Sequence, residues 1–337
     1  MKYRFLDYGL LIAFLLLDLS KSALLSWSHS NKGERERPLD FNVIFTKDTL
    51  SLSVSAIVCG VTYGGRLVGI LWQSRILFLQ YIPISLIFLA SQNAAFKALQ
   101  ILDIGTFKLF IQGCTPLTAV LSVLLLKKRY TKKEILAIIA VFLFSIFFYV
   151  VKSSSVSDHL ISLVDTGVTY SILVTVLSSL GGVVSEKALK SNPESLGLQF
   201  CYSRLAAVCI SATIYLFMPV EETHKEFFAF FDARTIIVIF QFALSGFLVA
   251  TITKRLSSTA KNVTQAASAG VAQIVTMVSI DWMHTNIKSV AATNTNPLAG
   301  LCAVGIVGSV VYFHVSSSGS KTVEHDEEAP QMQNEKE

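Results

Sequence analysis

Residues 102–151 read LDIGTFKLFIQGCTPLTAVLSVLLLKKRYTKKEILAIIAVFLFSIFFYVV, and this stretch decides the fold. Two apolar runs, at 102–126 and 135–151, flank the basic segment KKRYTKKE at 127–134. A helix needs roughly 20 mainly apolar residues to cross about 30 Å of membrane hydrocarbon. The stretch therefore predicts two membrane-spanning helices joined by a short basic connection.

The same alternation of long apolar runs and short polar gaps continues along the whole chain of 337 residues. Hydrophobic residues make up 52% of the sequence and charged residues 15%, whereas about a quarter of the residues of a soluble domain are charged. The pattern predicts an all-α membrane protein with ten transmembrane helices and no separate soluble domain. The predicted spans are 5–27, 49–72, 76–99, 102–126, 135–151, 163–189, 196–219, 235–256, 263–283 and 297–315.

The distribution of basic residues predicts the orientation. If the N-terminus is cytosolic, the basic 127–134 connection is cytosolic too, while the acidic gap EETHKEFFAFFDAR at 221–234 lies on the opposite side. The positive-inside rule then places both termini in the cytosol. We expect the first apolar run to be a retained span rather than a cleaved signal peptide, and the tail 317–337 to be disordered.

Two of the predicted spans share a polar pattern that indicates an internal duplication. Lys108 precedes Gln112 by four residues in the fourth span, and Lys261 precedes Gln265 by four in the ninth. Residues four apart share a helix face, and each span is the fourth of a five-span half. Because five is odd, the halves at 1–152 and 153–316 are expected to be inverted repeats, with a site near the membrane midplane between them.

Other polar and small residues within the spans lead to narrower expectations. Arg66 is expected to pair with Asp18, since charges inside a membrane are costly unless paired. Gly113 and Gly270 either loosen their helices or, as we favour, allow close helix packing.

Several other function classes find no support in the sequence. The cysteines lie inside apolar runs without CxxC spacing, and the histidines are far apart, so neither a metal site nor a cofactor is expected. The basic residues are dispersed at span edges rather than massed on a polar domain, which argues against nucleic-acid binding. No catalytic constellation gathers at one depth, so an enzyme is not expected.

Three stretches resemble the nucleotide-sugar transporters of the drug/metabolite transporter superfamily, in particular the branch of the CMP-sialic acid, UDP-galactose and UDP-N-acetylglucosamine carriers. They are SQNAAFKALQILDIGTFKLFIQGCTPLTAV from residue 91, GGVVSEKALKSN from residue 181 and TKRLSSTAKNVTQAASAG from residue 253. They are similar, in the same order, to the family's QNN and ALS segment, its EK-LK motif and its VKY-DNI-K segment.

The resemblance implies exchange of a cytosolic nucleotide sugar for lumenal nucleoside monophosphate by a ten-helix carrier of the membrane of the Golgi or of the endoplasmic reticulum. It also implies a homodimer or glycosyltransferases as further partners. Lysine ammonium groups would balance the phosphate charge. The expected substrate-binding residues are Asn93, Phe107, Lys108, Gln112, Glu186, Lys187, Tyr202, Ser203, Arg204, Lys254, Lys261 and Gln265.

Departures from the family pattern bear on the substrate. Cys114 stands where the family has a phosphate-contacting lysine, and Lys108 either replaces that lysine or extends to the lumenal interface. This argues against CMP-sialic acid and favours a UDP-sugar such as UDP-GlcNAc, UDP-GalNAc or UDP-galactose. Arg204 either binds phosphate or pairs with Glu186. A CMP-sialic acid carrier, a carrier of another organic anion and a non-transporting Golgi scaffold remain the alternatives.

Overall fold

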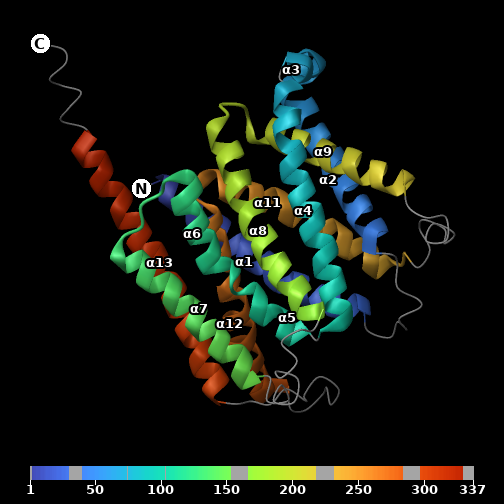
Figure 1. Cartoon of the computed structure of the whole chain (residues 1–337). Coiled ribbons are helices and arrows are strands. Elements are labelled where there is room, and N and C mark those ends of the chain that lie inside the picture. Colours follow the sequence, from blue (N-terminus) through green and yellow to red (C-terminus); the bar gives the residue numbers. More distant parts are fainter. Residues whose placement is uncertain are drawn as a thin grey trace, which may run out of the picture.

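The computed structural model describes residues 2–29, 40–73, 75–102, 104–152, 166–217, 231–283 and 297–328, and these residues fold almost entirely as helices (Figure 1). The elements are α1 (Lys2–His29), α2 (Asp40–Tyr63), the short 3-10 helix η2 (Gly64–Arg66), α3 (Leu67–Gln73), α4 (Arg75–Ile101), α5 (Ile104–Ile111), α6 (Cys114–Leu126), α7 (Lys132–Lys152), α8 (Thr166–Ser191), α9 (Leu196–Leu216), α11 (Ala233–Arg255), α12 (Ser258–Met283) and α13 (Pro297–Glu328).

Within the described residues, eight helical segments are long and apolar enough to cross a membrane. They correspond to α2, α4, the pair α5 and α6, α7, α8, α9, α11 and α13. The first and ninth predicted spans are also present as long helices, α1 and α12, and both pack inside the bundle. The structure therefore confirms an all-helical membrane protein with eight candidate spans.

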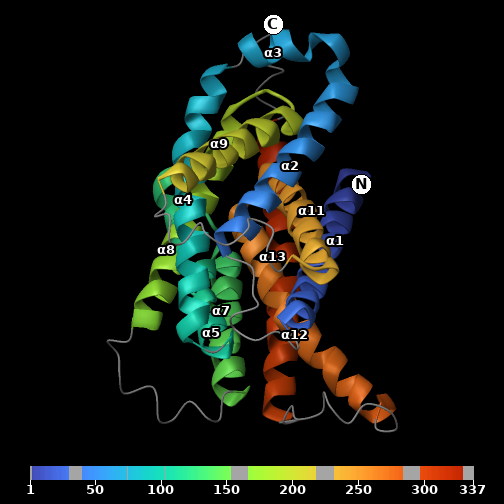
Figure 2. The ribbon, with the colours of Figure 1, turned by 90° about the vertical axis from the view of Figure 1, so that its right-hand side faces the viewer.

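The helices pack in a bundle in which elements distant in sequence lie side by side (Figure 2). α4 packs on α8 and α9, while α11 packs on α1 and α2. α6 contacts α8 and α12, α12 contacts α1 and α13, and α7 lies along α13. The first and last helices thus share α12 as a neighbour, and the start of α1 and the end of α13 lie at the same end of the molecule (Figure 1).

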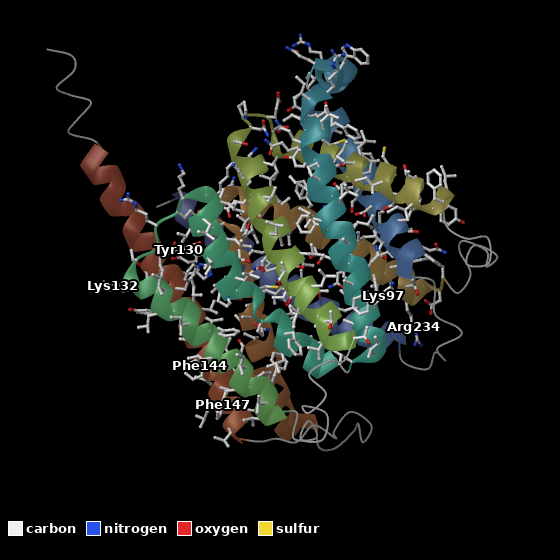
Figure 3. All side chains as sticks on the ribbon, in the orientation of Figure 1. Lys97, Tyr130, Lys132, Phe144, Phe147 and Arg234 are labelled. Carbon is white, nitrogen blue, oxygen red and sulfur yellow. The ribbon has the colours of Figure 1, made fainter. Side chains whose placement is uncertain are left out.

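Apolar side chains both fill the bundle and cover its outside. Val141, Phe148, Val263, Ala303 and Ile306 are buried where α7, α12 and α13 meet. On the outer face of α7, Phe144 and Phe147 are exposed between the polar end marked by Lys132 and the far end of the helix (Figure 3). An outer surface this apolar suits contact with lipid chains.

The boundaries of the second span differ from the prediction. α2 begins at Asp40 rather than at residue 49, so Asp48 lies inside a helix instead of in a loop. The helix ends at Tyr63, because Gly64 adopts a left-handed φ of +56° and starts η2. The predicted pair of Arg66 with Asp18 is wrong: Arg66 is exposed in η2, and the Asp18 carboxylate accepts a hydrogen bond from Ser268.

α13 also extends past the predicted end of the last span. It continues as helix through Glu328, whereas we expected disorder from residue 317. No proline interrupts the backbone hydrogen bonds until Pro330, and the residue before a proline disfavours helical geometry. The helix therefore ends close to the first residue that its backbone cannot accommodate; residues 329–337 lie outside the described residues.

Close packing of α12 on α13 depends on Gly270. A Cβ atom built there would lie 2.9 Å from the Ala303 carbonyl oxygen, closer than real Cβ contacts allow. This geometry confirms the packing role favoured for Gly270, because a backbone atom cannot move aside as a side chain can.

We expect Gly270→Ala to destabilise the protein by about 1–3 kcal/mol, because the added methyl group must push α12 and α13 apart. The measurement is the midpoint of thermal unfolding in detergent. Gly308→Ala on α13 is the matched control, since nothing lies within 4 Å of a Cβ atom at that position. Equal midpoints for the two variants would contradict this account of the interface.

Candidate functional site

The fourth span is interrupted near its middle. α5 ends at Ile111, α6 begins at Cys114, and Gln112 and Gly113 form a turn between them. Pro116 explains the interruption, because it has no N–H to donate to the carbonyl of Gln112 four residues earlier. That carbonyl accepts instead from the Thr115 N–H at 3.2 Å. The single helix predicted over 102–126 is therefore two helices with a break between them.

Neighbouring helices supply hydrogen-bond donors to the backbone at this break. Thr175 of α8 donates its hydroxyl to the Phe110 carbonyl at 3.0 Å, and Ser179 donates to the Cys114 carbonyl at 3.4 Å. Asn262 of α12 donates to the same Cys114 carbonyl at 3.5 Å and to the Thr118 hydroxyl at 2.8 Å. Irregular backbone inside a membrane persists only where protein groups satisfy it in this way.

Polar side chains from four parts of the bundle gather beside the break. The Tyr149 hydroxyl of α7 lies near the side chain of Gln112 and near Asp18 of α1. Asp18 Oδ2 in turn accepts a hydrogen bond of 2.5 Å from the Ser268 hydroxyl of α12. Lys261, also on α12, interacts electrostatically with the Cys114 thiol. We call these residues, Asp18, Gln112, Tyr149, Lys261 and Ser268, the central polar layer.

The central polar layer contains two of the residues predicted from sequence, Gln112 and Lys261. Gln265 lies one turn further along α12, half-buried, and its carbonyl accepts from Ser268. Phe107 and Lys108 are half-buried on α5, and Gln112 N–H donates to the Lys108 carbonyl at 3.2 Å. Of the two predicted Lys and Gln pairs, one therefore lies just before the break and the other on α12, which packs on α6 just after the break.

A second set of predicted residues lies at the end of the bundle that carries the basic connection. Glu186 of α8 is fully buried and accepts from Lys128 Nζ at 2.5 Å, Lys190 Nζ at 2.7 Å and the Ser258 N–H at 2.9 Å. Lys190 also donates to the Leu256 carbonyl at 2.7 Å. We call Lys128, Glu186, Lys190 and Ser258 the basic-end cluster. It ties three connections of the bundle together.

Lys187 and Lys254 behave differently from Glu186. Lys187 is exposed to solvent. Lys254 of α11 donates its ammonium to the Glu194 carbonyl at 2.7 Å and to Gln199 Oε1 at 3.2 Å, near the start of α9. Glu186 and Lys254 therefore join helix ends at the basic side of the bundle, and the structure does not bring them to the central polar layer.

The predicted residues of α9 face α2 and α4. Arg204 donates from Nη1 to Asp48 Oδ1 at 2.8 Å, so the predicted pair with Glu186 is wrong. Lys47 also lies 3.2 Å from Asp48 Oδ1 and donates to Gln92 of α4 at 2.7 Å. Ser203 accepts a hydrogen bond at its carbonyl from Ser85.

Tyr202 and Asn93 are held by their own surroundings. Tyr202 is buried in an apolar cluster with Leu77, Tyr81 and Leu198. Asn93 of α4 donates its amide to the Leu89 carbonyl of its own helix at 3.0 Å. The structure thus places the residues expected to share one site in separate parts of the bundle.

Sequence reasoning missed several partners because they lie far away in the chain. Asp48 was assigned to a loop, which hid its role as the partner of Arg204. Thr175, Ser179 and Asn262 have no pattern that would mark them, since a hydroxyl or amide in a membrane helix commonly bonds its own backbone. The signal that could have located them is Pro116, which guarantees at least one carbonyl in need of a donor.

Taken together, the apolar exterior, the broken helix and the polar interior define a multi-pass helical membrane protein with a functional centre inside the bundle. Its fold is similar to that of a solved crystal structure, with a TM-score of 0.58 at 15% identity, over 91% of this chain and 95% of the other. No curated protein matches the chain by sequence. The family model of the nucleotide-sugar transporters matches residues 71–307, more than half of the chain, and the protein belongs to this family.

Membership of this family makes the protein a transporter rather than an enzyme, with nucleotide sugars as its class of substrate. The resemblance seen in the three sequence stretches is thereby confirmed at the level of the family. All three stretches lie within the elements described above: the first runs through the broken fourth span, the second forms the end of α8 with Glu186, and the third includes the start of α12.

We expect Glu186→Ala to lower the free energy of unfolding by roughly 2–3 kcal/mol, because it leaves Lys128, Lys190 and the Ser258 N–H without their shared acceptor. The loss is less than for a fully buried pair, since both lysines are partly exposed. Thermal unfolding in detergent measures it. Lys187→Ala, at the exposed neighbouring position, should stay within about 0.5 kcal/mol of the wild type. An unfolding midpoint for Glu186→Ala as high as that of this control would refute the assignment.

Proposed function

We propose that the protein is an antiporter that exchanges a cytosolic nucleotide sugar for lumenal nucleoside monophosphate, with the substrate bound beside the broken fourth span. The observation that carries the proposal is the packing of the start of α12 against the start of α6, where Asn262, next to Lys261, donates to the Cys114 carbonyl at 3.5 Å and to the Thr118 hydroxyl at 2.8 Å. A nucleoside monophosphate or diphosphate group brings about two negative charges. A lysine ammonium and the positive end of a helix dipole both favour an anion at that point.

The positive charge of Lys261 inside the bundle would also favour a ligand that carries phosphate. A lysine ammonium is a compact point charge, and in a partly desolvated setting it gains far more from an anionic ligand than it would in water. Since Lys261 is half-buried, an approaching phosphate would replace water around it at low cost. The Gln112 and Gln265 side chains on the two facing helices would add neutral hydrogen bonds to the same ligand.

The packing of the helices supports the proposal of two inverted halves, at 1–152 and 153–316, with ten spans in total. If each helix of one half corresponds to a helix of the other, the contact of α4 with α8 corresponds to that of α11 with α1. Likewise the contact of α4 with α9 corresponds to that of α11 with α2, and α6 with α8 to α12 with α1. This correspondence is what a two-fold axis in the membrane plane would produce.

Alternating access follows from such an arrangement. The central site would open to one side of the membrane at a time as the halves rock against each other. Exchange requires that the empty carrier changes state slowly and the loaded carrier quickly. A ligand that balances the charge of Lys261 would lower the barrier in this way, because the ammonium would then pass through a closed, desolvated state together with a counter-charge.

A UDP-sugar such as UDP-GlcNAc, UDP-GalNAc or UDP-galactose is the substrate we favour. Cys114 lies at the break where the related carriers have a lysine, so the site has one fewer positive charge for an anionic sugar such as sialic acid. We place the protein in the Golgi membrane with both termini cytosolic. The orientation is supported by the basic connection 127–134, which lies at the same end of the bundle as the start of α1 and the end of α13 (Figure 1).

Uptake by proteoliposomes tests the function directly. The purified protein is offered radiolabelled UDP-, GDP- and CMP-sugars, with or without nucleoside monophosphate inside. We expect uptake of UDP-sugars only, stimulated by internal UMP. Equal uptake with and without UMP would argue against exchange, and stimulation by CMP or GMP instead would reassign the base. No uptake of any sugar by inserted protein would favour a scaffold or another substrate.

Lys261→Ala should lower UDP-sugar exchange on the order of tenfold, because a charge-assisted contact to phosphate is lost. The matched control is Lys133→Ala, which removes the same charge from an exposed position in the basic connection. Both variants should be inserted in equal amount. Wild-type uptake by Lys261→Ala would rule out the assigned role of this lysine.

A further inference from the structure

Asp18 is a carboxylate within the bundle that forms no ion pair with any side chain that the structure describes. It lies more than half-way along α1, is half-buried, and accepts a hydrogen bond from Ser268. The ion pairs in the described part of the chain involve Asp7, Asp48 and Glu186 instead. Because charged groups inside a membrane are costly, an unpaired carboxylate there indicates a function.

The other two deep carboxylates show what a structural role looks like in this protein. Asp48 is 2% exposed and is held by Arg204 and Lys47. Glu186 is fully buried and receives three donors. Asp18 has neither such burial nor such partners. An ionised carboxylate can accept about four hydrogen bonds, so the single bond from Ser268 leaves most of this capacity unused.

The position of Asp18 relates it to the proposed phosphate contact. Ser268, which holds Asp18, is seven residues beyond Lys261 on α12 and therefore about 10.5 Å further along the same helix face. Tyr149 lies near both Asp18 and Gln112 at the break. A ligand with its phosphates at Lys261 would therefore extend its sugar toward Asp18, over a length comparable with a pyrophosphate-linked hexose.

We propose that Asp18, oriented by Ser268, binds the hydroxyl groups of the sugar and selects neutral sugars over sugars that carry a carboxylate. Hexose hydroxyls are hydrogen-bond donors, and a carboxylate can accept from two neighbouring hydroxyls at once. A uronic or sialic acid would instead bring a second negative charge to Asp18, where the low dielectric strengthens repulsion. This inference rests on the proposed nucleotide-sugar function and names the substrate class of the same site.

UDP-glucose and UDP-glucuronic acid form the matched pair of probes, because they differ only in a hydroxymethyl group against a carboxylate. Each competes with radiolabelled UMP for purified protein, so UMP serves as a reference ligand without a sugar. We expect wild-type protein to prefer UDP-glucose by about tenfold or more. Asp18→Asn should reduce that preference to about twofold or less, because the amide no longer repels the carboxylate.

Two further variants separate a sugar contact from a structural role. Asp7→Asn makes the same charge change on α1 near the Arg255 side chain, 3.7 Å away, and should keep the wild-type preference. Ser268→Ala keeps the charge of Asp18 but removes the hydrogen bond that Asp18 accepts. We expect it to weaken the binding of UDP-glucose a few-fold, while UDP-glucuronic acid is still rejected. This variant tests the inference even if Asp18→Asn does not fold.

Each alternative outcome overturns a different statement. If the Asp18→Asn protein still rejects UDP-glucuronic acid, Asp18 is not the source of the selectivity. The same holds if Asp18→Asn weakens the binding of UMP, UDP-glucose and UDP-glucuronic acid equally. Unchanged selectivity with loss of pH-gradient-driven uptake would make Asp18 a proton-coupling residue instead. If wild-type protein binds neither UMP nor UDP-glucose, the proposed function is wrong, and the proposed contact between Asp18 and a sugar is wrong with it.

Discussion

The hydrogen bonds that satisfy the broken backbone of the fourth span are the constraint on which the centre of this protein depends. Lipid offers no donors, so the carbonyls freed around Gln112 must find partners inside the protein. Thr175 and Ser179 of α8 and Asn262 of α12 provide them. These side chains reach the break only when α8 and α12 lie against it. The need for hydrogen-bond donors at the break therefore fixes the positions of α8 and α12 beside it.

Charge is handled in three distinct ways within one bundle. At the basic end, Glu186 offsets two lysines and joins connections that would otherwise repel one another. Between α2 and α9, Asp48 balances Arg204 and Lys47. In the central polar layer, Asp18 is held by a hydrogen bond from Ser268 rather than by an ion pair with a described side chain.

The sequence predicts the positions of the helices well, but it does not predict which residues pair between helices. Apolar runs of the length of a bilayer are local features, so α4, α7, α8 and α9 were predicted to within a few residues. The early start of α2 was not, because its first turns carry Asp40, Lys47 and Asp48, and charge alone suggested a loop. Only the fold shows that Lys47 and Asp48 are paired. Arg204 pairs with Asp48 and not with Glu186 because α9 packs on α2. These helices are far apart in sequence, so the spacing of residues along the chain could not predict the pair.

One feature of the break also limits how the bundle can move. Its backbone acceptors belong to α5 and α6, whereas its donors belong to α8 and α12, and bonds of about 3 Å tolerate little displacement before they fail. Helices joined in this way cannot slide past each other at that depth, although they can tilt. The level of Gln112 and Gly113 is therefore the point about which a tilt of these helices would pivot. Under such a tilt, widening the bundle on one side of this level would narrow it on the other side.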